Sequence, residues 1–574
     1  MSKHEKLAAL NRRRFIKSAA AVGGAGMLAG CGGSSNVDTT TGGGDTTESG
    51  GDESDDDSTP SGEQPEGGTF VNTTGEAANT LDPRVNELAW VSNLVPYIYD
   101  GLLIQKPDGT GMAPHVAAEM PTRVDETTYT VQMNEGVTFH NGEEMTAEDV
   151  AYTYNWILDP ENQSVRRQDI SFMDSVEAVG DYEVRFNLAN PYALFFETLG
   201  MAVVPMSVAS EQGPDDFGQE PVGSGPFQFA NWEKSSQITL ERYEDYFLKL
   251  PNLDAVEYRV IPEGQVQFVE LATGGVNQAS VPNELLQKAE SEDNINMVTL
   301  DTFDYNGICF NALREPFDDV RVRKAMHYAV DFEELIEATK GVLGDRPYGY
   351  MPKSVNEAWG FPWQDWNEQY FPEKDHEDAH RLLEEAGYGD GFGKTLNMVS
   401  LGSSDFSSMS IILQRELDEL GYSAEITEQT IGQWIDTLNK DEYDMIDYGW
   451  TGGVDPDEFF YFLMRDVTND DGWEKPSESW AGNTSAGMLH QAYPDDEELT
   501  QADELIREAR TLTDRDERKS AYVEAANILQ SKYPHLQVFS EKSAVAYTDD
   551  VKDYELTSFS VQSLCNEWNN AYVE

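Results

Sequence analysis

Residues 133–160 read MNEGVTFHNGEEMTAEDVAYTYNWILDP, and this stretch decides the fold. Its first part, residues 135–142, is typical of a β-strand that ends in a tight Asn-Gly turn. Thr146 and Asp149 then have the spacing of a capping box, in which a hydroxyl and a carboxylate satisfy free backbone amides at a helix start. Apolar residues recur at helical spacing behind this cap until Pro160, so we expect a strand, a turn and an amphipathic helix.

Strand and helix patterns also alternate on both sides of this stretch. We expect a helix over 94–103 with a break at its glycine, strands over 129–131 and 536–539, and helices over 499–509 and 513–529. Strands that alternate with helices are typical of α/β lobes whose sheets are covered by helices. At 574 residues the chain exceeds one ordinary domain, so we expect two or three such lobes.

Several motifs in a fixed order make the sequence similar to a known family. Residues 133–160 resemble the signature region of family 5 extracellular solute-binding proteins, the oligopeptide, dipeptide and nickel receptors of ABC importers. Further resemblances lie at residues 222–227 (VGSGPF), 317–325 (FDDVRVRKA), 329–331 (AVD), 379–388 (AHRLLEEAGY) and 443–456 (YDMIDYGWTGGVDP). They cover residues 70–574, and motifs in family order are more specific than any one motif alone.

The resemblance implies an α/β, two-lobed, type II periplasmic-binding-protein-like fold with an extra inserted domain. Lobe I would comprise residues 69–108, 215–308 and 540–574, the inserted domain residues 109–214, and lobe III residues 309–539. The ligand would lie between lobes I and III. These lobes would close by bending near residues 302–310 and 536–542.

The N-terminal residues 1–31 have the pattern of an export signal. Arg12 and Arg13 form a twin-arginine pair, an apolar run follows over 19–28, and Cys31 ends a segment that resembles a lipobox. The run is shorter than the ~20 residues that span a bilayer, so we expect export and lipid anchoring on the outer face of the cell membrane. Residues 32–68 are rich in Gly, Ser, Thr and Asp, which predicts a flexible acidic linker.

The chain is strongly acidic, with 105 acidic against 39 basic residues and a formal net charge of −66. This balance excludes nucleic acid and anionic membrane surfaces as partners, because both need basic residues. The acidic residues are spread over the whole chain. We therefore favour adaptation to concentrated salt over recognition of a cationic ligand.

The chain has three cysteines, Cys31, Cys309 and Cys565. With Cys31 acylated, the other two could form one disulfide at most, and we favour two unpaired thiols. The absence of a Cys-x-x-Cys pair argues against a structural zinc site.

Residues 448–456, YGWTGGVDP, are the best candidate for a ligand site. Tyr448 and Trp450 could supply flat walls, and Asp455 with bare glycine amides could supply fixed polar groups. The alternative is a loop whose Trp packs internally. Tyr305 and Asn306 are weaker candidates, and they lie near a strand that we expect to cross between the lobes.

The resemblance has one informative departure at this loop. In peptide-binding relatives, an Asp three residues after the Trp pairs with the amino terminus of the peptide, whereas this chain has Gly453 there. A buried ammonium without a counter-charge is costly, so this departure argues against ordinary peptide binding. Asp455 or Asp457 could substitute for the missing carboxylate.

An alternative of another class comes from His376, Glu377 and His380, which fit the H-E-x-x-H pattern of a zinc peptidase. Charged Asp378 and Arg381 stand among these residues, and the segment has a helical apolar face. It also matches a helix of the receptor family that has no metal role. We therefore favour a surface helix.

Taken together, the residues and the resemblance predict a monomeric, non-enzymatic receptor without a cofactor, whose partners are the permease and ATPase subunits of an ABC importer. A di- or oligopeptide ranks first as ligand, before an oligosaccharide or a metal chelate. A sensor or adhesin that shares the fold, and the secreted zinc peptidase, are the other classes left open.

Overall fold

The computed structural model describes residues 67–402, 404–466, 485–559, 564–566, 568 and 570–573. The expected export signal, with Arg12, Arg13 and Cys31, lies outside the described residues, and so does the linker up to residue 66. Within the described ranges, no helix combines the length and the apolar character needed to cross a membrane.

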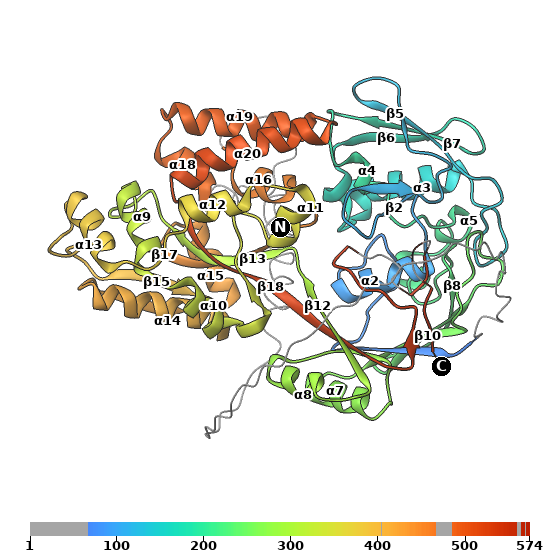
Figure 1. Cartoon of the computed structure of the whole chain (residues 1–574). Helices are drawn as coiled ribbons and strands as arrows, with labels where there is room; N and C mark the ends of the chain where they lie inside the picture. Colours follow the sequence, from blue (N-terminus) through green and yellow to red (C-terminus); the bar gives the residue numbers. More distant parts are fainter. Residues whose placement is uncertain are drawn as a thin grey trace, which may run out of the picture.

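Two halves of the molecule share a mixed sheet of twelve strands (Figure 1). The strand order is β16-β15-β17-β13-β18-β11-β1-β10-β9-β8, and β12 and β14 pair with β18. The strands are β1 (Thr69–Thr74), β8 (Phe227–Glu233), β9 (Gln237–Arg242), β10 (Ala255–Val260), β11 (Gln278–Ser280), β12 (Ile295–Asp301), β13 (Asp304–Phe310), β14 (Gly344–Asp345), β15 (Leu396–Ser400), β16 (Ala424–Glu428), β17 (Met445–Thr451) and β18 (His535–Thr548).

The two halves are joined by β18 and by the consecutive strands β12 and β13. In Figure 1, β12 and β18 run from the half that contains α9 and α13 to the half that contains β8 and β10. The first part of β18 pairs with β13, and residues 542–548 pair with β12. Gly307 permits this close crossing, since a Cβ there would lie 2.1 Å from the Leu536 carbonyl oxygen.

The prediction of a short strand over 536–539 was wrong about its length, because β18 has 14 residues. Its first six residues are buried, and burial then alternates toward Thr548. In sequence, the apolar signal weakens after Phe539, so the pattern predicts that the strand ends there. In the structure, the same strand leaves a core and continues along a half-exposed face.

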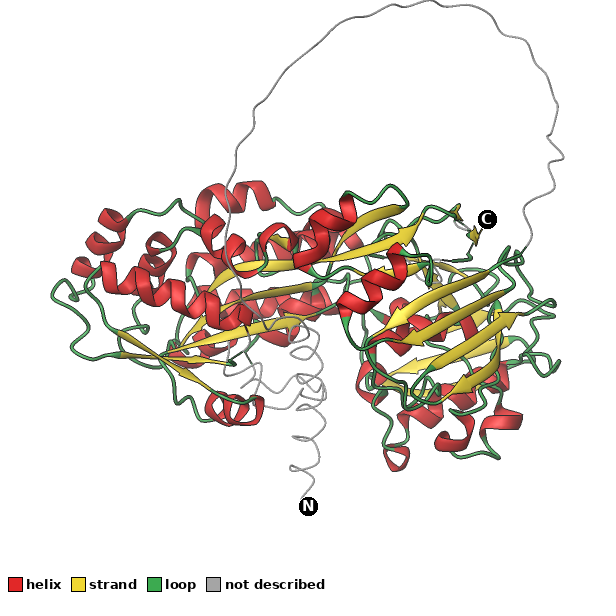
Figure 2. Cartoon of the chain, turned by 90° about the horizontal axis from the view of Figure 1, so that it is seen from below, coloured by secondary structure: helices red, strands yellow, loops and turns green. Residues whose placement is uncertain are grey.

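Helices cover the sheet in the half that holds β13 to β17, and Figure 2 shows helices beside the strands in both halves. Asp319, Asp331, Asp375 and Asp514 each cap a helix by accepting a backbone amide hydrogen. The helices of this half are α9 (Val320–Ala329), α10 (Phe332–Thr339), α11 (Lys353–Trp359), α12 (Trp363–Tyr370), α13 (His376–Glu385), α14 (Ser404–Glu419), α15 (Ile431–Asn439), α16 (Asp457–Leu463), α18 (Ser485–Ala492), α19 (Glu497–Thr511) and α20 (Arg515–Ser531).

A separate antiparallel sheet, in the order β4-β5-β7-β6, packs with α3 around its own apolar core. The predicted capping box of α3 is present, with Thr146 and Asp149 as its members. The strand predicted over 135–142 is absent, although the predicted turn forms, with the Gly142 amide donating to the Phe139 carbonyl at 2.8 Å. The elements are β4 (Thr122–Arg123), β5 (Thr128–Gln132), β6 (Met173–Ala178), β7 (Glu183–Leu188) and α3 (Ala147–Leu158).

The helix predicted over 94–103 is α2 (Ala89–Ile98), so its position was wrong by about a turn. It ends early because the Ile98 carbonyl accepts a hydrogen bond from the Gly225 amide at 2.9 Å, and the chain then continues in extended conformation. The remaining elements are β2 (Leu103–Gln105), β3 (Met112–Pro114), α4 (Phe195–Thr198), α5 (Met206–Ala209), α6 (Pro214–Phe217), α7 (Gly264–Ala272), α8 (Leu286–Glu290), β19 (Val551–Lys552) and β20 (Tyr572–Val573).

Cys309 and Cys565 are both buried, and neither forms a disulfide in the described chain. The expectation that the two do not pair with each other is therefore confirmed. Burial raises the pKa of the Cys565 thiol well above its ordinary value, so this thiol stays protonated and unreactive.

Candidate functional site

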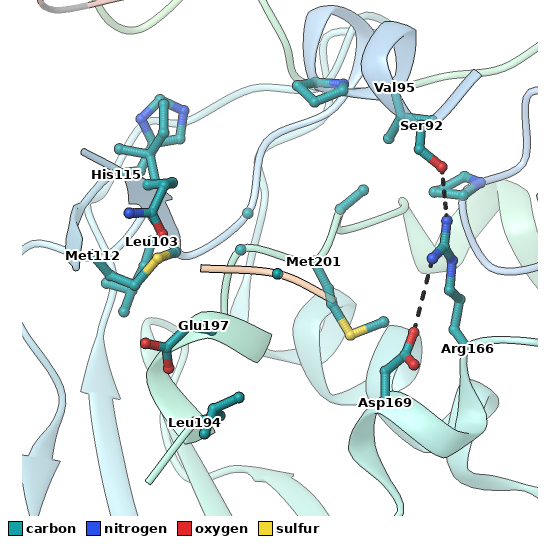
Figure 3. A pocket seen from close by; sticks show the side chains of 18 of the residues that line it. Ser92, Val95, Leu103, Met112, His115, Arg166, Asp169, Leu194, Glu197 and Met201 are labelled. Carbon is teal, nitrogen blue, oxygen red and sulfur yellow. Dashed lines mark hydrogen bonds and ion pairs between the residues drawn. The ribbon is translucent and has the colours of Figure 1, made fainter. Parts of the chain in front are cut away.

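A cavity of about 430 Å³ lies between the two halves, and Figure 3 shows part of its lining. Its wall comes from three stretches of the chain, within residues 83–115, 157–202 and 453–458. The volume falls in the range of about 300–1,000 Å³ that is usual for small-molecule sites. The site therefore depends on residues from both halves.

Apolar side chains form much of the wall. Leu103, Met112, Leu194 and Met201 line the cavity and are supplied by β2, β3, the N-terminal side of α4, and the segment that follows α4. Methionine side chains adapt their shape to different apolar groups. The cavity is suited to a ligand with an apolar body.

Asp455 lines the cavity but is already paired with a buried cation. Its two carboxylate oxygens accept hydrogen bonds from the Arg518 guanidinium at 2.7 and 2.8 Å, and one also accepts from the Asp457 amide at 2.9 Å. Asp455 is only 3 % exposed. These contacts give Asp455 a structural role in which its charge is balanced within the protein.

Asp457, the other proposed substitute for the missing carboxylate, faces away into the protein. Arg510 donates to it at 2.9 Å, and the hydroxyls of Tyr192 and Tyr522 lie 3.5 and 3.4 Å away. Tyr192 belongs to the chain segment before α4, and the Ala193 amide donates to the Arg510 carbonyl at 2.9 Å. This group of contacts joins the two sides of the cavity.

Gly453 lines the cavity, and the carboxylate of Glu458 occupies the space beside it. A Cβ placed on Gly453 would lie 2.7 Å from the Glu458 Oε1 atom. Glu458 also lines the cavity, and its carbonyl accepts a hydrogen bond from the Trp450 indole at 2.9 Å. An acidic group is therefore present next to Gly453, the position at which the resemblance implied an Asp.

Glu197, on α4, provides a second carboxylate. Its Oε2 atom is buried and accepts no hydrogen bond from any described residue. Burial, and to a smaller degree the negative charge of Asp455, raise the pKa of Glu197 to about 7, while Arg518 and Arg515 act in the opposite direction.

Arg166 and Asp169 lie on the other side of the cavity from Glu197, with Met201 between them in Figure 3. The Arg166 guanidinium donates to the Ser92 hydroxyl at 2.9 Å and lies 3.8 Å from an Asp169 oxygen. Both side chains are about a third exposed. This basic group is accessible and is only loosely held.

The other predicted site residues do not line this cavity. Trp450 packs against Phe462, with ring centroids 6.1 Å apart, which is the internal packing of the alternative interpretation. Tyr448 is buried, Tyr305 is fully buried and stacks on the His535 ring, and Asn306 donates to Asp304 at 2.9 Å. A direct role of these four in ligand binding remains a prediction.

His376, Glu377 and His380 lie on α13, far along the chain from the cavity walls. The His376 ring contacts Glu416 at 2.9 Å, and His380 lies 3.5 Å from Glu384. The described residues contain one group that could hold a metal ion, His376 with Glu416 and Glu419, and His380 is not a member of it.

Glu416 in that group is already neutralised by protein cations. Lys374 lies 2.5 Å from one of its oxygens and Arg415 lies 2.5 Å from the other. Although burial opposes its ionisation, these hydrogen bonds keep the pKa of Glu416 below its ordinary value. A metal ion bound at this group would have to displace Lys374 from Glu416. Because the group also lacks His380, it does not supply the two histidine ligands of a zinc peptidase.

Comparison with known proteins identifies the family. The model of bacterial extracellular solute-binding proteins, family 5 middle region, matches residues 111–472. The chain belongs to this family. Its members are substrate-binding proteins of ABC importers, extracellular or periplasmic, and not enzymes.

Among curated family 5 relatives, the oligopeptide-binding protein AppA of Bacillus subtilis is 27% identical over 451 residues, which is 74% of this chain and 78% of AppA. The heme-binding protein A of Haemophilus influenzae is 25% identical over 524 residues, 86% of this chain and 90% of the relative. The dipeptide-binding protein of Escherichia coli is 24% identical over 488 residues, 80% and 86% of the two chains.

Solved structures of the family share the fold. HbpA2 of Haemophilus parasuis superimposes with a TM-score of 0.74 at 19% identity, over 88% of this chain and 100% of that one. AppA of B. subtilis in complex with a nonapeptide gives 0.66 at 23% identity, over 89% and 100%. The predicted α/β, two-lobed, type II periplasmic-binding-protein fold is confirmed.

The sequence predicted two residues that line the cavity, Gly453 and Asp455, which lie on one wall. It predicted no residue of the opposite wall. Glu197 and Arg166 belong to no motif, and single charged residues carry no signal in a chain with 105 acidic residues. Glu458 lies one residue beyond Asp457 and had no distinguishing pattern either. What singles out Glu197 is a buried carboxylate oxygen, Oε2, that accepts no hydrogen bond from any described residue, which is a property of the folded chain.

Proposed function

We propose that this chain is the lipid-anchored extracellular receptor of an ABC importer, which captures a short peptide between two closing lobes and delivers it to the permease. The observation that carries the proposal is the cavity of about 430 Å³ whose walls come from both halves of a family 5 fold. A ligand that contacts both walls stabilises the closed arrangement, which the importer can then recognise. Relatives named for oligopeptide and dipeptide binding support a peptide as the ligand.

The proposed lobes are those expected from the resemblance: lobe I from 69–108, 215–308 and 540–574, the inserted domain from 109–214, and lobe III from 309–539. Support comes from the crossing strands, because residues 302–310 and 536–542 lie where β13 and β18 pass between the halves. Bending there would move the 453–458 loop relative to Glu197.

The ligand is tested by thermal unfolding and calorimetry of the chain with sets of di- and tripeptides. A ligand that binds only the folded state at 100 times its Kd stabilises it by about 2.7 kcal/mol, which raises the melting temperature. Oligosaccharides and metal chelates serve as comparison sets. If a comparison set shifts the melting temperature and no peptide does, the peptide assignment is wrong. Because the acidic surface fits adaptation to salt, each set is measured at low and at high KCl concentration.

Anchoring and delivery need separate experiments in cells. We expect Cys31→Ala to release the receptor from the membrane fraction, and Arg12→Lys with Arg13→Lys to block its export. Deleting the gene should abolish uptake of the peptide that binds. Uptake that continues unchanged would favour the sensor or adhesin alternative, in which the receptor has no permease or ATPase partner.

A further inference from the structure

The corner where α19 ends and α20 begins contacts the proposed inserted domain, residues 109–214. The Ala193 amide donates a hydrogen bond to the Arg510 carbonyl at 2.9 Å, and the Arg515 guanidinium donates to the Thr110 carbonyl at 3.0 Å. Arg510 lies in the last turn of α19, and Arg515 is the first residue of α20. In Figure 1, the end of α19 reaches the half that contains β5, β6 and β7. These contacts therefore join segments from different halves of the molecule.

The Arg510 side chain lies between two tyrosine rings. Its Cζ atom is 3.5 Å from the centroid of the Tyr461 ring and 4.6 Å from the centroid of the Tyr192 ring. Tyr461 belongs to α16, in the same half as Arg510, whereas Tyr192 precedes α4 in the other half. Arg510 is 6 % exposed and Tyr192 is 7 % exposed, so water is largely excluded from their contact. A cation is attracted to the face of an aromatic ring, and the attraction is stronger when both groups are desolvated.

Arg510 is held in place by its own half. Its guanidinium donates to Asp457 at 2.9 Å, and both residues lie within the proposed lobe III, residues 309–539. This ion pair therefore stays together whether the lobes are open or closed. Bending at the proposed hinges would separate Arg510 from Tyr192 and from the Ala193 amide, and would expose the two side chains to water.

The contact adjoins the cavity on both sides. Leu194 lines the cavity and follows Tyr192 by two residues, and Glu458 lines it and follows Asp457 by one residue. Tyr192 and Arg510 are not themselves part of the cavity wall. They can therefore hold the two walls together without touching a ligand.

We propose that Tyr192 and Arg510 form a latch that favours the arrangement in which the two halves are in contact, before any ligand is bound. The latch rests on the proposed closing of the lobes and deepens it, because part of the free energy that favours closure comes from the protein itself. When a ligand binds the closed form, the apparent Kd equals the intrinsic Kd divided by the closed fraction. The latch thus raises the affinity for a ligand that it does not contact.

A second neighbour of Tyr192 supplies a matched control. The Tyr192 and Phe172 rings, both in the proposed inserted domain, have centroids 4.3 Å apart. Phe172→Leu changes the packing around Tyr192 within its own domain and keeps the aromatic face that Arg510 contacts. Tyr192→Phe also keeps this face and removes the hydroxyl alone.

The experiment compares the native chain with Tyr192→Leu, Tyr192→Phe and Phe172→Leu. Small-angle X-ray scattering of the ligand-free chains measures how far the two halves open, and calorimetry measures the Kd for dipeptides with apolar side chains. Circular dichroism verifies that each variant is folded. Hydrogen exchange of the segment that contains Ala193, followed by mass spectrometry, adds a measurement on the native chain that needs no variant.

We expect Tyr192→Leu to increase the radius of gyration of the ligand-free chain and to raise the Kd about threefold to tenfold, because leucine offers no aromatic face to the guanidinium. Tyr192→Phe and Phe172→Leu should keep the native radius and Kd. The Ala193 amide should exchange slowly in the ligand-free native chain, since it donates to the Arg510 carbonyl, and faster in Tyr192→Leu.

A ligand-free Tyr192→Leu chain as compact as the native chain would overturn the latch. So would an equal opening of Phe172→Leu, which would trace the effect to packing within the inserted domain. Should Tyr192→Leu fail to fold, fast exchange at Ala193 in the ligand-free native chain would overturn the latch and slow exchange would support it. If no dipeptide bound the native chain, peptide capture would be wrong, whereas the scattering of the ligand-free chains would still decide the latch.

Discussion

Two acidic regions meet at the cavity, and they use their charge differently. On the 453–458 loop, Asp455 and Asp457 each pair with a buried arginine, Arg518 and Arg510, which come from α20 and α19. On α4, the buried oxygen of Glu197 has no such partner in the described chain. A carboxylate that the protein itself neutralises holds the structure together, whereas a buried one without a partner destabilises the folded state when it is ionised.

The largest effect should come from breaking the balanced region. Asp455→Ala would leave the buried Arg518 guanidinium without its counter-charge, and we expect a loss of about 3–5 kcal/mol in the free energy of unfolding. Denaturant unfolding measures this loss. Asp455→Leu combined with Arg518→Met removes both charges and should recover most of it. A stable Asp455→Ala chain would show that the pair is not structural.

A smaller effect should follow from adding a carboxylate at the glycine. Gly453→Asp would place its Cβ 2.7 Å from Glu458 Oε1, so crowding and repulsion should destabilise the chain by about 1–3 kcal/mol. Adding Glu458→Ala in the same chain should restore stability, because it frees the space. If Gly453→Asp alone were neutral, the Glu458 side chain would not be confined beside the glycine.

A further effect is a pH dependence that comes from Glu197. Its pKa is raised from 4.5 to about 7 by folding, so between these pH values the folded chain binds a proton that the unfolded chain has released. The free energy of unfolding therefore falls as pH rises through this window, by up to about 3 kcal/mol.

Glu197→Gln should flatten this slope relative to the native chain, and Glu211→Gln, which replaces an exposed carboxylate outside the cavity wall, should leave it unchanged. Asp304 and Asp447, whose pKa values burial raises to about 7, contribute the same background to all three chains. Thermal unfolding between pH 4.5 and pH 8 measures the difference. A slope that Glu197→Gln leaves unaltered would mean that Glu197 is solvated like an ordinary surface acid.

Much of the fold could be predicted from short stretches. The capping box of Thr146 and Asp149 and the helices α19 and α20 appeared where expected, because caps and apolar periodicity involve residues a few positions apart. The limits of β18 and α2 could not be predicted in this way. Both are set by partners distant in sequence, β12 and Gly225.

The candidate site was predictable on one side only. The 448–456 stretch stood out through its aromatic and glycine residues, yet the structure places Gly453 and Asp455 at the cavity and packs Trp450 inside. Composition indicates which residues can recognise a ligand. Which of them face the cavity depends on how the loop packs against α16 and α20.

The sequence by itself determined the family, through its ordered motifs, and the local elements, through caps and periodicity. Only the tertiary structure decided which carboxylates are neutralised and which remain unsatisfied. Arg518 is 63 residues from Asp455 in the chain, and Glu197 comes from α4, in another part of the cavity wall. The charge state of an acid depends on the solvent and the cations that surround it in space, and folding alone brings those together.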